Sequence, residues 1–311
     1  MILQSALIVI QQIGIIFLLI GIGFLAAKFG LIGQEGARQL TDLLLIIVIP
    51  CVIIMAFQTA FEQSLIKNML IAALFAALTH FLGILISRLL FRNSAPERRT
   101  MLTYSTVFYN AGFFSLPLLR ALLGDAGVLY GSVFVAVFNL FAWTYGIRLM
   151  DGENGAARWK TFLNPGIIAL IIALSLVLLN IKLPVVLKTA LTYLTGLHTP
   201  LAMIIIGSQF FAFREQFTLR DSELWKTVLA RNLLVPLLML GLIYLFAQEK
   251  TLFFASVITA AAPTATNTIL FATKFKQDVN TAVQAVILTT LLTILSIPLM
   301  MSLAMLLKGA L

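Results

Sequence analysis

The chain alternates between long apolar runs and short polar connections. Ten runs have a length of about 20 residues or more, which at 1.5 Å per residue is enough for a helix to cross a bilayer. They cover residues 6–28, 38–60, 66–90, 100–120, 126–149, 163–181, 185–211, 226–247, 251–273 and 279–307. The connections leave no room for a soluble domain. The pattern therefore predicts an all-α membrane protein with about ten transmembrane helices.

The composition agrees with a lipid-facing surface. Hydrophobic residues make up 61% of the chain and charged residues 11%, with a mean hydropathy of +1.05. Soluble domains are about 45–50% apolar and about 25% charged. The first charged residue is Lys28, so no basic region precedes the first apolar run. We therefore expect residues 6–28 to remain in the protein as a span, not to be cleaved as a signal peptide.

Basic residues indicate the orientation in the membrane. The net charge is +9, but Lys and Arg form short clusters between apolar runs, which is typical of membrane orientation and not of nucleic-acid binding. Fifteen follow odd-numbered runs: Lys28, Arg38, Arg88, Arg92, Arg98, Arg99, Arg148, Arg158, Lys160, Arg214, Arg220, Lys226, Arg231, Lys274 and Lys276. The other six are Lys67, Arg120, Lys182, Lys188, Lys250 and Lys308. The positive-inside rule then predicts a multi-pass protein of the cell (inner) membrane with both termini on the non-cytoplasmic side.

The sequence lacks the motifs of the enzymes considered. It contains neither the HExxH motif of metalloproteases nor the GxxxxGK[ST] loop that binds nucleotides. His80, His198 and Cys51 fall in separate runs, without the spacing of metal ligands. We therefore expect no enzyme activity, no cofactor and no metal site.

An internal repeat appears when the chain is shifted by 150 residues. Pro50 then falls on Pro200, and NAGFFSLP (110–117) falls on AAAPTATN (260–267). Both windows place proline and polar residues inside an apolar run, the fourth and the ninth. Because five spans precede the second copy, that copy enters the membrane from the opposite side. The pattern predicts two inverted five-helix repeats, residues 1–150 and 163–311, joined by a cytoplasmic linker at 151–162.

The paired windows predict a polar site in the middle of the membrane. A broken helix exposes backbone N–H groups at the start of its second half, and these suit an anion such as a carboxylate. Backbone interrupted at this depth is tolerated only beside protein or a water-filled cavity. Pro50 and Pro200, taken alone, are more simply explained as kinks. The candidate binding residues from the windows are Asn110, Gly112, Pro117, Pro263, Thr264, Thr266 and Asn267.

Residues 108–146 and 256–300 resemble the auxin efflux carrier family, which includes the plant PIN proteins and many prokaryotic permeases. The similarity extends over essentially the whole chain, which resembles a prokaryotic-type member. It implies ten spans in two inverted repeats, in which the broken fourth and ninth helices cross, as in NhaA and the bile acid symporters. It also implies a scaffold part, a transport part and the movement of organic anions, either auxin-like acids or dicarboxylates.

The resemblance adds residues to the candidate site and reveals two departures. Asn139 and Thr144 match the polar part of the family's fifth span. Tyr109 stands where plant members have a proline, and Thr268 or Ile269 stands near the place of a second proline. These departures argue against auxin itself as the substrate. The candidate supporting residues are Pro50, Pro200, His80 and Tyr109.

Several functions remain open at this stage. The first is a secondary transporter, an exporter or uniporter that works by alternating access and is driven by the membrane potential. The alternatives are a passive channel or membrane receptor on the same helices, or a sodium- or proton-coupled carboxylate symporter. His80 is the best candidate for carrying a proton, because no Asp or Glu lies near the middle of a run. The expected partners are a small organic anion and the lipid bilayer, with no nucleic acid; a homodimer is left open.

Overall fold

The computed structural model describes residues 2–60, 66–151, 165–216 and 220–310. Within these ranges the chain is helical and contains no strand beyond one isolated bridge. The all-α prediction is therefore confirmed for the described residues. The predicted linker at 151–162 lies outside them, apart from Asp151 at the end of α7.

The helices have the following bounds. The first half contains α1 (Ile2–Lys28), α2 (Gln34–Leu43), η1 (Leu44–Val48), α3 (Ile49–Ala60), α4 (Ile66–Leu90), α5 (Pro96–Val107), η3 (Ala111–Ser115), α6 (Leu116–Phe141), η4 (Ala142–Gly146) and α7 (Ile147–Asp151). The second half contains α8 (Pro165–Leu178), α9 (Val185–Gly196), α10 (His198–Ala212), η7 (Arg214–Gln216), α11 (Ser222–Leu229), η8 (Ala230–Leu234), α12 (Val235–Phe246), α13 (Lys250–Ala260), α14 (Asn267–Lys274) and α15 (Val279–Lys308).

Several helical segments suit a bilayer by length and composition. Among the described residues, seven are long and apolar enough to cross it: Leu7–Lys28, Gln34–Gln58, Ile66–Leu90, Ala111–Met150, Val185–Ala212, Ser222–Phe246 and Val279–Lys308. Two shorter apolar helices are Pro165–Leu178 and Lys250–Ala260. The 40-residue segment is not one straight helix, because Gly124 adopts φ 63° and ψ −153°, a conformation open essentially to glycine alone.

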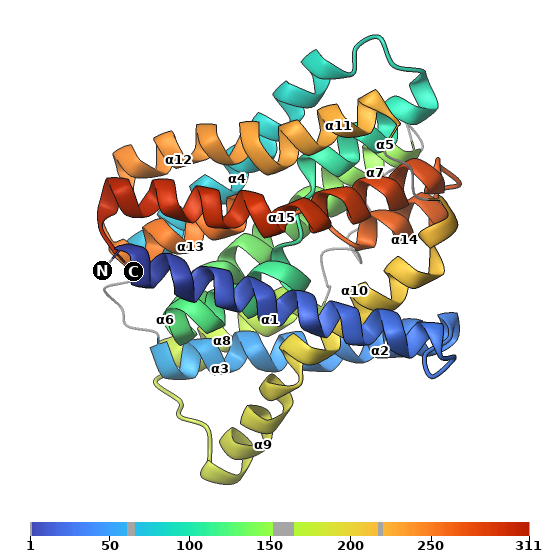
Figure 1. Cartoon of the computed structure of the whole chain (residues 1–311). Coiled ribbons are helices and arrows are strands. Elements are labelled where there is room, and N and C mark those ends of the chain that lie inside the picture. Colours follow the sequence, from blue (N-terminus) through green and yellow to red (C-terminus); the bar gives the residue numbers. More distant parts are fainter. Residues whose placement is uncertain (1, 61–65, 152–164, 217–219, 311) are drawn as a thin grey trace.

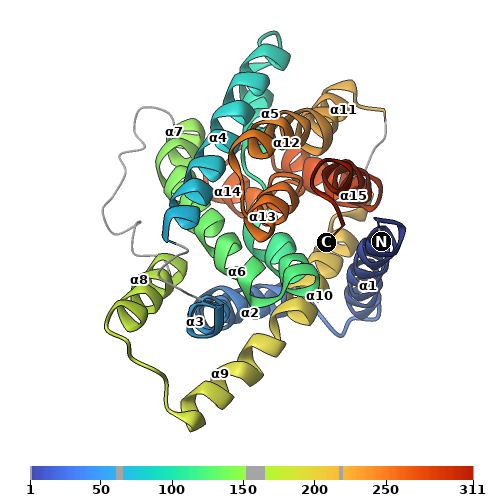
Figure 2. The same ribbon diagram turned by 90° about the vertical axis from the view of Figure 1, so that its left-hand side faces the viewer.

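The helices form two groups, seen end-on in Figure 2. The first helix group consists of α1, α2, α3, α8, α9 and α10; in it α1 packs along α10, and α3 packs on α8 and α9. Gly23 and Gly207 allow the close approach of α1 and α10, since a Cβ at either would meet the backbone of the other helix. The second helix group consists of α4, α5, α6 and α11 to α15, together with the turns η3, η4 and η8 that pack with them. Its α6 also packs on α3, so the two groups meet there.

Three prolines each follow a widened helical turn. The π-helical turns η1, η3 and η8 end two residues before Pro50, Pro117 and Pro236. A proline lacks an N–H and crowds the carbonyl four residues earlier, so the preceding turn widens instead of breaking. Pro200 is the third residue of α10, just after α9 ends at Gly196. Pro50 and Pro200 therefore shape their helices without lining an interruption like those described below.

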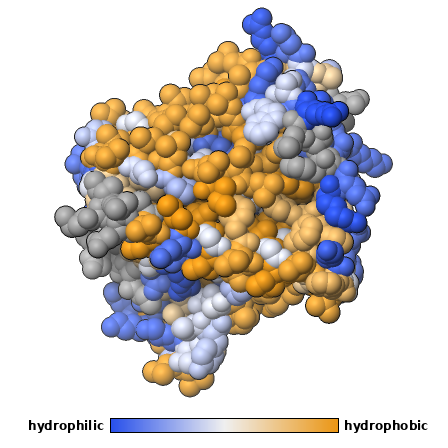
Figure 3. Space-filling model, viewed as in Figure 1, coloured by the Kyte–Doolittle hydropathy of each residue, from blue (hydrophilic) through white to orange (hydrophobic). Residues whose placement is uncertain are grey.

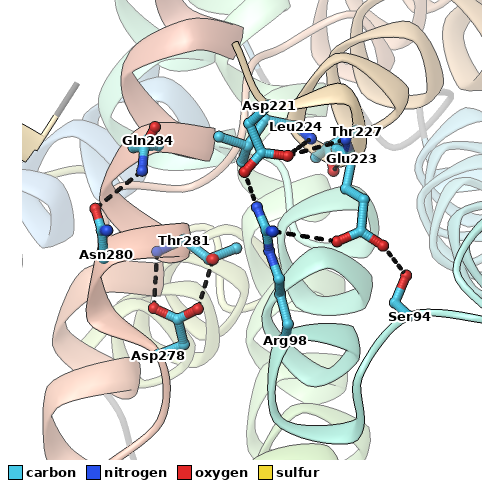
Figure 4. Close-up of polar contacts among 10 residues, drawn as sticks. All are labelled: Ser94, Arg98, Asp221, Glu223, Leu224, Thr227, Asp278, Asn280, Thr281 and Gln284. Carbon is cyan, nitrogen blue, oxygen red and sulfur yellow. Dashed lines mark hydrogen bonds and ion pairs between the residues drawn. The ribbon is translucent and has the colours of Figure 1, made fainter. Parts of the chain in front are cut away.

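The polarity of the surface changes along the direction of the helix axes (Figure 3). On the face shown in Figure 3, hydrophobic residues cover the middle, and hydrophilic residues gather toward the two ends. Both termini lie at the same end (Figure 1). At the opposite end, Arg98 in the first turn of α5 pairs with Asp221 and, at 3.3 Å, with Glu223, which also accepts a hydrogen bond from Ser94 (Figure 4). These contacts fix the connection between α4 and α5 to the start of α11.

Candidate functional site

Two helices are interrupted at one place in the second helix group. The chain leaves the helix between Val107, where α5 ends, and Ala111, where η3 begins. It also leaves the helix between Ala260, the end of α13, and Asn267, the start of α14. The two interruptions lie at the windows singled out in the sequence, although the first one starts before Asn110.

The interrupted segments satisfy each other's backbone groups. Tyr109 and Thr264 form an isolated antiparallel bridge. The backbone N–H of Asn110 donates to the carbonyl of Pro263 at 2.7 Å, and that of Ala265 donates to the carbonyl of Phe108 at 2.9 Å. Unpaired backbone groups in an apolar interior are costly, so these bonds replace the helical bonds lost at the interruptions. We call this junction the crossing, defined by residues 108–110 and 261–266.

Asn110 begins the helix that follows the first interruption. Its Oδ1 accepts hydrogen bonds from the backbone N–H groups of Phe113 at 3.0 Å and Phe114 at 3.2 Å, as an N-cap residue does. Its Nδ2 has no hydrogen-bond partner among the described residues, although the side chain is only 4% exposed. The Oδ1 atom of Asn110 therefore caps the helix, while its Nδ2 remains a donor that a ligand could use.

A cavity of about 350 Å³ lies beside the crossing, between the two helix groups. Residues of the second group that line it include Tyr109, Asn110, Ala111, Gly112, Phe113, Val135, Phe138, Asn139, Ala142, Trp143, Ala265, Thr266, Asn267, Leu270 and Phe271. The first group contributes Thr41, Asp42, Leu45, Ile46, Ile49, Pro165, Gly166 and Gln209. The wall is mostly apolar. Asn110, Thr266 and Asn267 are polar lining residues at the starts of η3 and α14, and the other Thr, Asn, Asp and Gln side chains of the lining lie on other helices.

The cavity contains part of the residue set expected from the sequence. Five of the nine candidate binding residues line it, together with Tyr109 from the supporting set; the five are Asn110, Gly112, Asn139, Thr266 and Asn267. The rest of the set lies outside its lining: Pro117, Thr144, Pro263, Thr264, Pro50, Pro200 and His80. Pro117 is buried as the second residue of α6, which continues directly from the widened turn η3.

Thr264 and Pro263 build the crossing without lining the cavity. Oγ1 of Thr264 donates to the carbonyl of Ser105 at 2.7 Å, and its backbone N–H donates to Oγ1 of Thr289 at 3.1 Å. Thr144 instead bonds within its own helix, to the carbonyl of Leu140 at 2.6 Å. These hydroxyls stabilise backbone, which is a structural task and not a ligand contact.

His80 lies behind Tyr109 as seen from the cavity. Its ring stacks on Phe141 with centroids 4.5 Å apart, and the Tyr109 ring is 4.9 Å away. Nδ1 lies 2.8 Å from the carbonyl of Ala76, and Nε2 has no hydrogen-bond partner within the described part of the chain. The histidine is therefore packed in an aromatic cluster next to the site.

Arg231 is the main residue that the sequence analysis misplaced. We counted it among the basic residues of a connection, but it lies in η8, inside the apolar segment Ser222–Phe246, and is 0% exposed. Its Nη1 donates to the carbonyl of Thr106 at 3.2 Å, and its Nη2 donates to the carbonyl of Ala260. Its Cζ is 5.4 Å from the centroid of the Tyr109 ring. The basic count on that side of the membrane therefore loses one residue, leaving fourteen against six.

The cavity has both positive helix ends and a carboxylate in its surroundings. Two helix starts, at η3 and α14, contribute residues to the cavity lining, and the positive end of a helix dipole favours an anion. The guanidinium of Arg231 lies near Tyr109, which is one of the lining residues. Asp42 and Gln209 face the cavity from the other helix group, and Oε1 of Gln209 has no described partner. Among the described residues, no three His, Cys, Asp or Glu side chains gather into a metal site.

Comparison with known proteins gives a consistent result. The chain matches the family described as membrane transport protein over residues 8–159 and 153–301. A similar protein of Methanothermobacter thermautotrophicus is 24% identical over 91% of this chain and 94% of its own length. Another, of Methanocaldococcus jannaschii, is 23% identical over 92% of this chain and 95% of its own length. Both carry the name uncharacterized transporter.

Proposed function

Because the chain belongs to this family of membrane transport proteins, the PIN-like family that its two interrupted segments resemble, we propose that it is a secondary transporter of small organic anions. The observation that carries the proposal is the unpaired Nδ2 of Asn110, buried at a helix start that lines the cavity. A carboxylate oxygen accepts from an amide N–H and is favoured at the positive end of a helix. The substrate class is an auxin-like acid or a dicarboxylate.

The cavity suits an anion with a hydrocarbon or aromatic body. Small-molecule sites have volumes of about 300–1,000 Å³ and are apolar with a few polar groups that fix orientation. Here Phe113, Phe138 and Trp143 supply apolar wall, and Asn110 and Asn267 supply amides. The carboxylate binds at the two helix starts, and the apolar part of the substrate lies against the aromatic side chains.

The proposed architecture has ten spans in two inverted repeats, residues 1–150 and 163–311. The fourth span is α5 with η3 and the part of α6 before Gly124, and the ninth is α13 with α14. Support comes from the antiparallel pairing of the two interruptions, since the fourth and ninth spans are equivalent under a shift of 150 residues. The family resemblance agrees with this arrangement.

The position of the cavity between two helix groups supports alternating access as the mechanism. We infer that the second helix group carries the crossing and its ligand, and that the first group is the scaffold past which it moves. Both termini lie on the non-cytoplasmic side of the cell membrane in this proposal. The basic ends of α1 and α14, at Lys28 and Lys274, support it, because they lie at the molecule's end opposite the termini (Figure 1).

The membrane potential is the proposed driving force. It is worth about 2.3 kcal/mol per charge per 100 mV, and an interior-negative potential drives anions outward without a coupling ion. The absence of a coupling ion distinguishes a uniporter from a proton- or sodium-coupled symporter. The other alternative function, a channel or receptor, does not explain why two interrupted helices are paired across an internal repeat.

The experiment is flux in liposomes that contain the purified protein. The potential is set with potassium and valinomycin, and a labelled monocarboxylate or dicarboxylate is followed. Saturable, trans-stimulated flux that responds to the potential supports a uniporter. Unsaturable flux supports a channel, no flux for any carboxylate supports a receptor, and flux that ignores the potential but needs a proton or sodium gradient supports a symporter.

A matched pair of variants then locates the site. Asn110→Ala is expected to lower the apparent affinity roughly 5- to 150-fold, the effect of losing about 1–3 kcal/mol of hydrogen bonding. Asn93→Ala is the control, because Asn93 is exposed and does not line the cavity. Equal flux in both variants would show that the anion binds elsewhere.

A further inference from the structure

Arg231 presents an unusual arrangement for a charged group inside a membrane segment. It is fully buried, and its two hydrogen bonds go to the carbonyls of Thr106 and Ala260. The ion pairs found among the described residues involve other basic side chains, so no described carboxylate pairs with it. An ionisable side chain at this depth is rare and needs a partner that offsets its desolvation.

The partners of Arg231 are the ends of two helices. Thr106 is the penultimate residue of α5, and Ala260 is the last residue of α13. The last carbonyls of a helix have no intrahelical donor and carry a partial negative charge of about 0.5. Two such ends together amount to roughly one negative charge, which matches the single positive charge of a guanidinium. The crossing therefore holds a cation site made of backbone oxygens, and the chain's own side chain fills it.

Hydrogen bonds of the residue next to Arg231 hold the turn that carries the guanidinium. Nδ2 of the next residue, Asn232, donates to the carbonyl of Thr289 at 2.8 Å and to Oγ of Ser296 at 3.2 Å. Thr289 also accepts the backbone N–H of Thr264 in the crossing. The η8 turn, α15 and the crossing are thus bonded together around Arg231, all within the second helix group.

We propose that Arg231 is a built-in cation, which replaces an alkali ion at the crossing. In transporters with interrupted helices, unwound carbonyls and half-helix C-terminal ends coordinate sodium or protons. Here the guanidinium occupies the equivalent carbonyls, so the protein binds no alkali ion at this place and its flux needs none. The statement about flux rests on the proposed function, whereas the statement about ion binding does not.

The test is the thermal unfolding of the purified protein in sodium, lithium or potassium chloride, against N-methylglucamine chloride at equal ionic strength. The wild type is expected to unfold at the same temperature in all four salts. Arg231→Ser vacates the carbonyl site and is expected to become more stable as sodium or lithium is added. A sodium-dependent rise in the wild type, or a folded Arg231→Ser without any cation response, overturns the proposal.

Two further variants keep the test decisive if Arg231→Ser does not fold. Arg231→Lys retains a cation and is expected to stay close to the wild type, whereas Arg231→Met retains bulk without charge and is expected to unfold about 5–10 °C lower. Equal stability of the Lys and Met variants overturns the proposal. Arg98→Ser is the matched control: it removes an arginine paired with carboxylates at the end of the molecule, and its stability must not depend on the alkali ion.

The outcomes separate this inference from the proposed function. If sodium stabilises the wild type and the protein still transports carboxylates in response to the potential, only the proposal that Arg231 replaces an alkali ion is refuted. If the unfolding temperatures depend on the cations as expected but the protein moves no carboxylate, only the transport proposal is refuted.

Discussion

The two interrupted helices differ between their starts and their ends. We call the starts open, because they line the cavity, and the ends closed, because their carbonyls bond to Arg231. The starts, at η3 and α14, face the cavity, and the amide Nδ2 of Asn110 has no partner among the described residues. The ends, at Thr106 and Ala260, are not part of the cavity lining, and their carbonyls accept hydrogen bonds from Arg231. A single crossing therefore leaves donors for a ligand and satisfies acceptors internally. In the proposed function the anion binds at these starts, which are the positive ends of their helices.

Asn110→Asp gives the strongest test of the open starts. Aspartate keeps an oxygen that caps the helix, but it replaces the free donor with a negative charge. We expect roughly 100-fold weaker binding of a carboxylate or more, since like charges brought together cost several kcal/mol. Competition of labelled substrate in liposomes measures the affinity, and the unfolding temperature reports on the cap. An Asp variant that binds as well as the wild type would refute the role of Nδ2.

Asn267→Ala tests the second helix start. Asn267 is the first residue of α14 and lines the cavity. The expected loss is about 1–2 kcal/mol, roughly 5- to 30-fold in affinity, with little change in stability. Asn280→Ala, at the start of α15 and away from the cavity, is the matched control in the same flux assay. A larger effect of the control than of Asn267→Ala would place the ligand elsewhere.

Thr264→Val tests the backbone between starts and ends, and we expect the smallest effect. It removes the donor to the carbonyl of Ser105 while keeping the branched shape. We expect a loss of about 1 kcal/mol in stability and unchanged substrate affinity. Thr144→Val removes a hydroxyl that bonds only within its own helix and is expected to be nearly neutral in the same thermal unfolding measurement. Weakened binding in Thr264→Val without a loss of stability would mean that the hydroxyl contacts the ligand.

The sequence predicts the open starts better than the closed ends, for a physical reason. Proline and asparagine inside an apolar run are visible from local chemistry, and so the windows of Asn110 and Asn267 are found without a structure. Pro117 shows the limit, because a proline that follows a widened helical turn looks the same in sequence as one at a break.

The parts that sequence reasoning missed depend on packing between distant segments. Thr41, Asp42 and Gln209 join the cavity only because the first helix group packs beside the crossing. Arg231 was counted with the basic residues between runs, although the predicted run 226–247 contains it. In the structure, α11 begins at Ser222 and continues as helix to Arg231 in η8. A basic residue nine positions into a helix that is apolar beyond it is the signal that could have identified it.

The place of Arg231 in the second helix group has an electrical consequence. If that group moves through the membrane field, it carries the charge of Arg231 with it, because the helix dipoles that stabilise this charge have no net charge of their own. A bound monocarboxylate cancels this charge, so the loaded form crosses as a neutral unit, and the unloaded form returns as a cation drawn inward by the interior-negative potential. Exchange of one monocarboxylate for another is then insensitive to voltage, whereas net export is electrogenic, with the current arising in the step that carries no substrate.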